Sequence, residues 1–176
     1  MRVIAGSRGG TRLLAPPGRG TRPTADRVRE ALFSILGDLT GLDVLDLFAG
    51  SAALGIESLS RGAARATLVD SSRVAVRVIR RNLEATRLSA EVVPRPAAEF
   101  LRQARAAARQ YDLVFLDPPY RLAGALRGEF SAALTPVLAD GARVVAESDR
   151  RQPLPLDLPL LDERRYGDTL IRIHGS

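Results

Sequence analysis

Short apolar runs alternate with stretches of helical periodicity through most of this chain. The runs predict strands over residues 43–48, 65–70, 91–94, 111–117 and 142–148. The stretches between them predict helices over residues 54–61, 72–87, 97–109 and 124–138. Because strands that alternate with helices build βαβ units, the sequence predicts an α/β fold with a parallel sheet.

Hairpins are predicted at both ends of this pattern. The strands that would form them lie over residues 2–5 and 11–15 and over about 158–165 and 168–174. Gly9-Gly10 and Gly167 supply the two turns, because glycine is a strong turn signal between strands. We therefore expect a basic amino-terminal hairpin or arm over residues 1–20 and a single domain over residues 21–176.

A further helix is predicted between this arm and the first strand of the alternating region. Thr24 would cap the helix, which would run to about Leu39. Apolar residues recur along one face of it at helical spacing, namely Val28, Leu32, Ile35 and Leu36.

The basic residues are all arginine, and they cluster near the amino end. Residues 1–30 carry seven arginines against two acids, so most of the formal net charge of +6 lies there. Guanidinium groups fit phosphate oxygens, and a local basic cluster is typical of a nucleic-acid surface. We favour a phosphate-binding arm over the alternative, a solvated flexible tail.

The absence of cysteine and the position of the single histidine argue against several kinds of site. The chain has no cysteine, which excludes disulfides and cysteine-ligated metals. His174, the only histidine, lies two residues from the end and suggests a structural role rather than a triad or metal ligand. Glu57, Glu84 and Glu99 fall on predicted helices and are expected at the surface. Without a signal peptide or a membrane-spanning apolar run, we expect a cytoplasmic protein with no membrane contact.

The tetrapeptide Asp117-Pro118-Pro119-Tyr120 ends the strand predicted over residues 111–117. Open α/β sheets bind ligands at the carboxyl ends of their strands. Two successive prolines fix two φ angles and remove two N–H donors, which leaves a stiff turn with a carboxylate, carbonyl groups and one aromatic ring. Such a turn suits a planar group that carries an NH2. Taken alone, it is also consistent with a proline-rich turn and a helix-capping aspartate.

A second motif lies where the strand over residues 43–48 meets the next helix. Ala49-Gly50-Ser51 supplies a tight turn after Asp46, and Asp70 ends the following strand 20 residues after Gly50. A glycine turn followed at this distance by a strand-end acid is typical of nucleotide-ribose binding. The single glycine and Asp46 favour a ligand with a cationic amino-acid end, such as S-adenosylmethionine, over a dinucleotide. An ordinary βαβ turn is the alternative.

Together these motifs resemble those of a known class of enzyme. Asp46-Leu-Phe-Ala-Gly50, Asp70 and Asp117-Pro-Pro-Tyr120 look like class I S-adenosylmethionine-dependent methyltransferases that act on an exocyclic or amide nitrogen. The segment Arg22-Pro-Thr-Ala-Asp-Arg-Val-Arg-Glu-Ala-Leu-Phe-Ser-Ile-Leu36 is similar to the bacterial 16S ribosomal RNA guanine-N2 methyltransferase D family. Shorter matches extend the resemblance from about Arg2 to Ile173, namely Ile4-Ala-Gly6, Gly9-Gly10, Ser51-Ala-Ala-Leu-Gly55 and Tyr166-Gly-Asp-Thr169.

The resemblance implies a Rossmann-like class I sheet closed by the carboxyl-terminal hairpin, and methyl transfer to the exocyclic N2 amine of a guanine in 16S ribosomal RNA. The implied catalytic residues are Asp117, Pro118, Pro119 and Tyr120. The implied cofactor-binding residues are Asp46, Phe48, Ala49, Gly50, Ser51, Asp70, Ser71 and Ala97. The implied RNA-binding residues are Arg8, Arg12, Arg19, Arg22, Pro23, Thr24 and Arg27. We expect a monomer that needs no metal and acts on 16S ribosomal RNA within the 30S subunit or an assembly intermediate.

The chain departs from the family pattern at a few positions. Ala52 stands where a second glycine is usual, so its methyl group would either weaken cofactor binding or be absorbed by a different turn. Asp70 stands where glutamate is frequent, and Pro96-Ala97 lacks a polar residue often found beside the adenine. Two other functions stay open. The Asp117-Pro-Pro-Tyr120 motif is shared with adenine methyltransferases, which leaves N6 methylation of adenine in RNA or DNA, and Ala52 leaves a non-catalytic RNA-binding module. The chain has no room for a separate DNA target-recognition domain.

Overall fold

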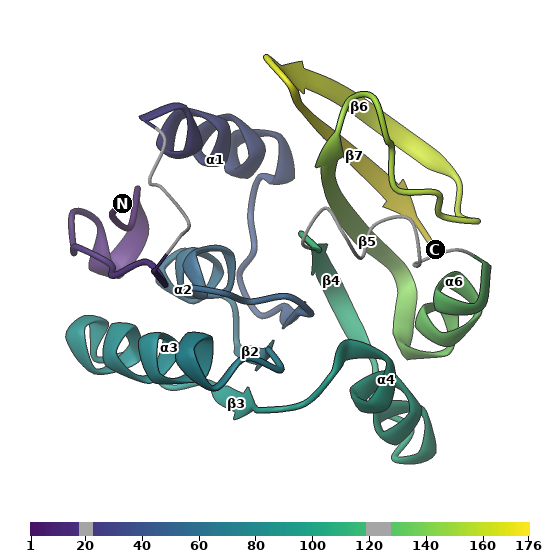
Figure 1. The fold of residues 1–176 in the computed structure, drawn as a ribbon, viewed down its shortest axis with the longest axis horizontal. Coiled ribbons are helices and arrows are strands. Elements are labelled where there is room, and N and C mark those ends of the chain that lie inside the picture. The colour runs from purple at the N-terminus through teal and green to yellow at the C-terminus, as the bar shows by residue number, and fades with distance from the viewer. Residues whose placement is uncertain (18–22, 119–127) are drawn as a thin grey trace.

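The computed structural model describes residues 1–17, 23–118 and 128–176. Within these residues, seven strands form one sheet in the order β3-β2-β1-β4-β5-β7-β6 (Figure 1). The strands are β1 Asp43–Asp46, β2 Arg65–Val69, β3 Glu91–Val93, β4 Tyr111–Leu116, β5 Leu138–Asp149, β6 Leu160–Tyr166 and β7 Thr169–Gly175. Strands β1 to β5 are parallel, whereas β7 is antiparallel to both β5 and β6. The predicted parallel sheet with a carboxyl-terminal hairpin is therefore confirmed.

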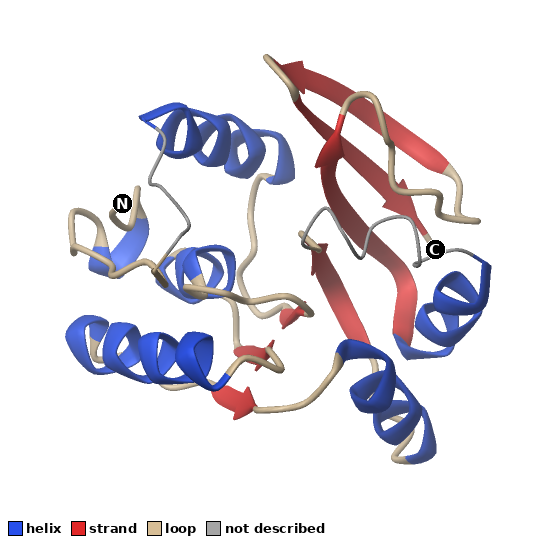
Figure 2. Ribbon diagram, in the orientation of Figure 1, coloured by secondary structure: helices blue, strands red, loops and turns tan. Residues whose placement is uncertain are grey.

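Helices cover both faces of this sheet, as Figure 2 shows. The helices are α1 Pro23–Leu36, α2 Ala53–Ser60, α3 Arg73–Thr86, α4 Ala97–Ala106 and α6 Gly128–Leu134. Helices α1, α2 and α3 pack on one face, and α4 and α6 pack on the other. In β4, Phe115 faces the first group, whereas Val114 and Leu116 face the second. Both faces are buried, which explains why the middle parts of the parallel strands are mostly apolar.

Helix α1 differs from its prediction at both ends. It begins at Pro23, so Thr24 lies inside the first turn rather than at the cap. Proline is favoured at this first position because the N–H it lacks would have no partner there. The helix ends at Leu36 rather than near Leu39, and Gly37 follows with a φ of 69°. Such a left-handed glycine commonly ends a helix.

The helix predicted over residues 124–138 is shorter in the structure. Residues 128–134 are α-helical, a 3-10 turn follows at Thr135–Val137, and residues 124–127 lie outside the described part of the chain. Pro136 interrupts the α-helix because it lacks the N–H that would continue the hydrogen bonding. Strand β5 then begins at Leu138, earlier than predicted, and Leu138 pairs with Tyr111 across a register shift in the β4–β5 ladder.

The amino-terminal segment, residues 1–17, packs on the helices of the first face. The predicted hairpin is present as one antiparallel bridge between Arg2 and Arg12, with a 3-10 turn at Gly6–Arg8 between them. Val3 and Leu13 are buried in the core cluster that contains residues of α1, α2 and α3. At Gly6, an added Cβ would lie 1.9 Å from the carbonyl oxygen of Ser60. The segment therefore shares a core with the rest of the chain.

Glu57 of α2 fastens this segment to the sheet domain. Its carboxylate accepts hydrogen bonds from the backbone N–H of Ile4 at 2.6 Å and of Ala5 at 3.0 Å. The same side chain accepts from Arg61 Nε at 2.7 Å and is completely buried. The expectation that Glu57 lies at the surface is wrong, because the acid satisfies two N–H groups that the short hairpin leaves unpaired.

The contacts of Glu57 predict a large effect of its removal. Glu57→Ala would leave two N–H groups and a guanidinium without their acceptor. We expect the free energy of unfolding in urea titrations to fall by about 3 kcal/mol. We also expect hydrogen exchange at Ile4 and Ala5 to become faster. The exposed Glu84→Ala is the control and should change stability by about 0.5 kcal/mol or less. Equal effects of the two variants would contradict this assignment.

Candidate active site

The order of the strands reverses between β1 and β4, and this reversal places the candidate site. Ligands of open α/β sheets bind in the crevice outside the carboxyl ends of the strands at such a point. Asp46 is the last residue of β1, and Asp117 follows the end of β4, its neighbour in the sheet. Asp70 follows β2 on the other side of β1. The topology therefore brings three predicted acids to one end of the sheet.

The electrostatics of this crevice favour a cation. Asp46 is 2% exposed and accepts a hydrogen bond from the backbone N–H of Gly55 at 3.3 Å. Burial, followed by the neighbouring carboxylate of Asp117 and then that of Asp70, raises the pKa of Asp46 to about 7. A ligand that brings positive charge would relieve this repulsion, whereas a phosphate would add to it. The three carboxylates therefore fit the cationic amino-acid end of S-adenosylmethionine better than a pyrophosphate.

The turn after β1 is held by backbone and carboxylate hydrogen bonds. The N–H of Ala49 donates to the carbonyl oxygen of Val69 at 3.0 Å. Gly50, with a φ of 58°, donates its N–H to Asp70 Oδ2 at 2.8 Å. Asp70 Oδ1 in turn accepts from the N–H of Ser72, the capping residue of α3, at 2.8 Å. The Asp70 carboxylate thus joins the turn after β1 to the start of α3.

Ala52 has a left-handed backbone, with φ 61° and ψ 26°, at the cap of α2. This conformation costs a residue with a Cβ about 1 kcal/mol or more, which explains why glycine is usual there. The side chain is completely buried and belongs to the core cluster on the α1, α2 and α3 face. The methyl group is therefore packed in the core, while the backbone keeps the left-handed conformation that glycine adopts without strain.

Sequence reasoning gave no structural role to two residues that shape the site. Gly55 lets α2 approach β2, because an added Cβ would lie 2.3 Å from Leu68 Cδ2. Asn82 of α3 is completely buried and donates from Nδ2 to the carbonyl oxygens of Ser51 at 2.9 Å and Leu14 at 3.0 Å. Its Oδ1 accepts from the N–H of Leu14 at 2.8 Å. A polar residue on the buried stripe of α3 was the available signal.

The predicted cofactor residues after β1 and β2 lie together at this end of the sheet. They are Asp46, Phe48, Ala49, Gly50, Ser51, Asp70 and Ser71. Phe48 is half-buried, with its ring centroid 6.3 Å from that of Phe130 in α6. Ala97 is buried at the first position of α4. Asp117 is half-buried and Pro118 is buried, whereas Pro119 and Tyr120 lie outside the described residues.

The predicted RNA-binding residues are more dispersed. The N–H of Arg8 donates to Ser60 Oγ at 2.9 Å, so Arg8 lies at the opposite end of α2 from the turn at Gly50. Arg12 lies in the amino-terminal bridge, and Arg27 is exposed on α1. Pro23 and Thr24 form the first turn of α1. Arg19 and Arg22 lie outside the described residues.

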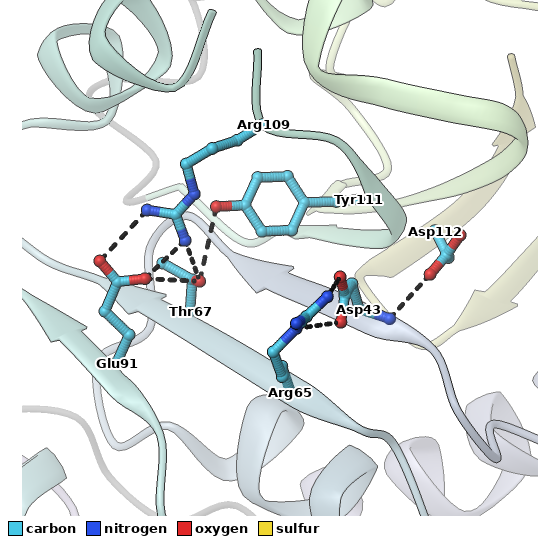
Figure 3. Close-up of polar contacts among 7 residues, drawn as sticks. All are labelled: Asp43, Arg65, Thr67, Glu91, Arg109, Tyr111 and Asp112. Carbon is cyan, nitrogen blue, oxygen red and sulfur yellow. Dashed lines mark hydrogen bonds and ion pairs between the residues drawn. The ribbon is translucent and has the colours of Figure 1, made fainter. Parts of the chain in front are cut away.

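A second polar cluster, drawn in Figure 3, lies at the opposite end of the parallel strands. It lies beside a hollow of about 560 Å³. Arg109 forms an ion pair with Glu91 and donates to Thr67 Oγ1 at 3.0 Å. Arg65 forms an ion pair with Asp43. These residues stand at or near the amino ends of the parallel strands, and each charge already has a partner of opposite sign. The cluster therefore stabilises this end of the sheet and is not a candidate active site.

The described residues contain neither a candidate metal cluster nor a candidate membrane-spanning helix. Over residues 1–17, 23–118 and 128–176, no group of three or more potential metal-ligating side chains is placed to hold an ion. Helices long and apolar enough to cross a membrane are likewise not found in these ranges. His174 is buried, with Nδ1 3.0 Å from the carbonyl oxygen of Leu158, in the structural role expected of it.

Comparison with known proteins identifies relatives along the whole chain. A family described as conserved hypothetical protein 95 matches residues 1–175. A putative ribosomal RNA methyltransferase of Bacillus subtilis is 37% identical, over 99% of this chain and 98% of that protein. The ribosomal RNA small subunit methyltransferase D of Escherichia coli K12 is 38% identical, over 88% of this chain and 78% of that protein.

Solved structures agree with these relatives. A putative methyltransferase from Escherichia coli has a TM-score of 0.81 at 36% identity, covering 99% of this chain and 97% of that chain. A hypothetical protein from Thermus thermophilus has a TM-score of 0.87 at 32% identity, covering 100% of this chain and 99% of that chain. A Thermus thermophilus 16S rRNA N2 G1207 methyltransferase, in complex with AdoMet and guanosine, has a TM-score of 0.70 at 21% identity, which shows the fold alone. It is matched over 92% of this chain and 45% of that chain.

The raised pKa of Asp46 predicts a pH-dependent loss of stability. An unfolded aspartate has a pKa near 3.8, so the folded protein binds more protons between about pH 4 and pH 7 and loses stability as pH rises through this range. Asp46→Asn removes this loss. The free energies of unfolding of the variant and the parent are measured by urea titration without ligand. The variant's value minus the parent's should be about 2 kcal/mol larger at pH 8 than at pH 5. The exposed Asp140→Asn should show no such change. A difference that shrinks with rising pH would contradict the assignment.

Proposed function

This chain belongs to the ribosomal RNA small subunit methyltransferase D family, and we propose that it transfers a methyl group from S-adenosylmethionine to the exocyclic N2 amine of a guanine in 16S ribosomal RNA. The observation that carries the proposal is the convergence of Asp46, Asp70 and Asp117 on the crevice between β1 and β4. Asp46 and Asp70 would bind the cofactor, and Asp117 would accept a hydrogen bond from the target amine.

The cofactor would be held by the residues after β1 and β2. S-adenosylmethionine, when bound, supplies a methyl group activated on a sulfonium sulfur. Asp46 would lie near its ammonium group, where a positive charge stabilises the ionised carboxylate. The Asp70 carboxylate would accept hydrogen bonds from the ribose hydroxyls. The turn at Ala49, Gly50 and Ser51 would lie beneath the amino-acid end, with Ser71 and Ala97 toward the adenine.

The target amine would be positioned by the residues after β4. Asp117 would accept one N–H of the amine and the carbonyl group of Pro118 the other, which turns the nitrogen lone pair toward the methyl carbon. Phe48 would form a wall of the site, and Tyr120 would stack on the base. Pro119 would stiffen the turn that joins Pro118 to Tyr120. Asp117 need not act as a strong base, because the amine can lose its proton after methylation. Catalysis would come mainly from positioning and exclusion of water.

The RNA substrate would have to present an exposed guanine. N2 takes part in Watson–Crick pairing, so the base must be unpaired or flipped out before the amine can reach Asp117. The amino-terminal arginines, together with Pro23, Thr24 and Arg27 of α1, would hold the flanking strand through its phosphates. We further propose that the protein acts as a monomer without a metal, on the 30S subunit or an assembly intermediate.

The proposed role of Asp70 predicts a selective loss of cofactor affinity. Asp70→Ala removes an acceptor for the ribose hydroxyls and for the N–H of Gly50. We expect the Kd for S-adenosylmethionine, measured by titration calorimetry, to rise about 10- to 100-fold. Asp70→Glu keeps the carboxylate and should lose much less, and the exposed Asp140→Ala should bind like the parent. Unchanged affinity in Asp70→Ala would exclude the proposed ribose contact.

The proposed reaction predicts a defined product. The parent chain, given radiolabelled S-adenosylmethionine and unmethylated small ribosomal subunits, should yield N2-methylguanosine on nucleoside analysis. Asp117→Ala should lower kcat/KM about 100-fold or more while the Kd for the cofactor changes little, because its acceptor orients the amine. Methyladenosine as the product would favour the N6-adenine alternative. Absence of transfer to subunits and to free RNA would favour the RNA-binding module.

A further inference from the structure

A groove of about 320 Å³ lies between the amino-terminal segment and α3. Figure 1 shows the two elements side by side, and the hydrogen bonds between Leu14 and Asn82 join them. Leu14 and Pro17 line one wall, and Val74 and Val78 line the other. The groove thus has apolar walls on a surface that elsewhere carries many charges.

The groove walls expose apolar side chains that a folded protein normally buries. Leu14 is 52% exposed and Val74 is 39% exposed, and both lie at this one place. Val74 and Val78 are separated by four residues, so they lie one above the other along α3. An apolar slot bounded by aliphatic side chains can accept the flat face of an unstacked base, since every base has an apolar face.

Arginines form the rim of the groove and continue along α3. Arg77 and Arg81 line the groove, and Arg73 and Arg80 lie on the adjacent side of the helix. All four are exposed, and in the described part of the chain none of them forms an ion pair. Elsewhere exposed arginines such as Arg65 and Arg164 do pair with acids.

The spacing of these arginines indicates a partner rather than a solvated face. A solvated helix commonly alternates acids and bases at intervals of four residues, which stabilises it. Here Arg73, Arg77 and Arg81 repeat at that interval, so like charges oppose one another, and Glu84 is the one acid within α3. Repulsion of this kind is relieved when a polyanion binds. The charge is therefore complementary to a nucleic-acid backbone.

The groove is joined to the candidate active site through Asn82. Its side chain bonds Leu14 of the groove wall and the carbonyl oxygen of Ser51 in the turn after β1. The helix that carries the arginines begins directly after Ser72, whose N–H is held by Asp70. A strand bound along α3 would therefore run toward the crevice where the target base must enter.

We propose that this groove and the arginines of α3 bind the ribosomal RNA strand that flanks the target nucleotide. An unstacked base lies between Leu14 and Val74, and the adjoining phosphates lie on Arg77 and Arg81. The identity of the strand rests on the proposed function, whereas the binding surface rests on the geometry of residues 14–17 and α3. The arginines favour RNA over a protein partner, because four unpaired guanidinium groups match a row of phosphates.

The test compares two double variants with the same change of charge. Arg77→Gln with Arg81→Gln removes two guanidinium groups from the groove, and Arg102→Gln with Arg105→Gln removes two exposed ones from α4, on the other face of the sheet. Affinity for an unmethylated 16S ribosomal RNA transcript is measured at several salt concentrations. We expect the groove variant to lower the slope of log K against log salt by about 1.4, the value for two phosphate contacts on a single strand. The α4 variant should match the parent.

A photoreactive phenylalanine analogue at position 74 then identifies the occupant. Crosslinking to RNA, lost when Arg77 and Arg81 are both replaced by Gln, supports the proposal. Crosslinking on small subunits to a ribosomal protein instead of RNA would overturn it, as would equal salt slopes for the two double variants.

The two proposals fail in different ways. Normal methylation by the parent, together with an unaltered slope in the groove variant, would overturn only the groove. Failure of the parent to methylate subunits, with the expected change of slope, would overturn only the proposed reaction. The four replaced arginines are exposed, so we expect each double variant to fold like the parent. A melting temperature equal to that of the parent, measured by circular dichroism, would show that the fold is intact.

Discussion

The parallel pairing of β1 with β4 is the interaction on which the rest of this structure depends. It joins the two halves of the sheet at the place where the strand order reverses, and it continues beyond β1 through the hydrogen bond from Leu47 N–H to the carbonyl oxygen of Phe115, at 3.1 Å. The same pairing brings the acids that follow the two strands together. The core on either face, and the crevice at the strand ends, both follow from this one ladder.

The crevice is costly to maintain, and its surroundings hold it in place. A buried Asp46 faces two other carboxylates, and Ala52 keeps a left-handed backbone beside it. Features of this kind persist where neighbouring contacts fix the local conformation, and they concentrate at functional sites. Here Asn82 holds the turn from α3, while Glu57 holds the amino-terminal segment against α2. The small hairpin thus braces the site as well as carrying positive charge.

Sequence patterns predicted the features that depend on neighbouring residues and missed those that depend on distant ones. Strands β2 and β4 lie within a residue of their predictions, because each has a largely apolar segment bounded by turn signals. Asp46, Asp70 and Asp117 lie at the end of the sheet that their positions in or after these segments predict. Strand β5 began earlier than predicted, because Asp140 and Gly141 interrupt its apolar pattern. Glu57 and Asn82 satisfy backbone groups 53 and 68 residues away, and no local pattern contains those partners.

The arginines of α3 have a consequence that follows from their chemistry alone. The chain contains no lysine, so every side-chain cation on this face is a guanidinium. Acetylation, which silences many nucleic-acid-binding surfaces by neutralising lysine, has no ε-amine to act on here. The positive charge of this surface is set at translation.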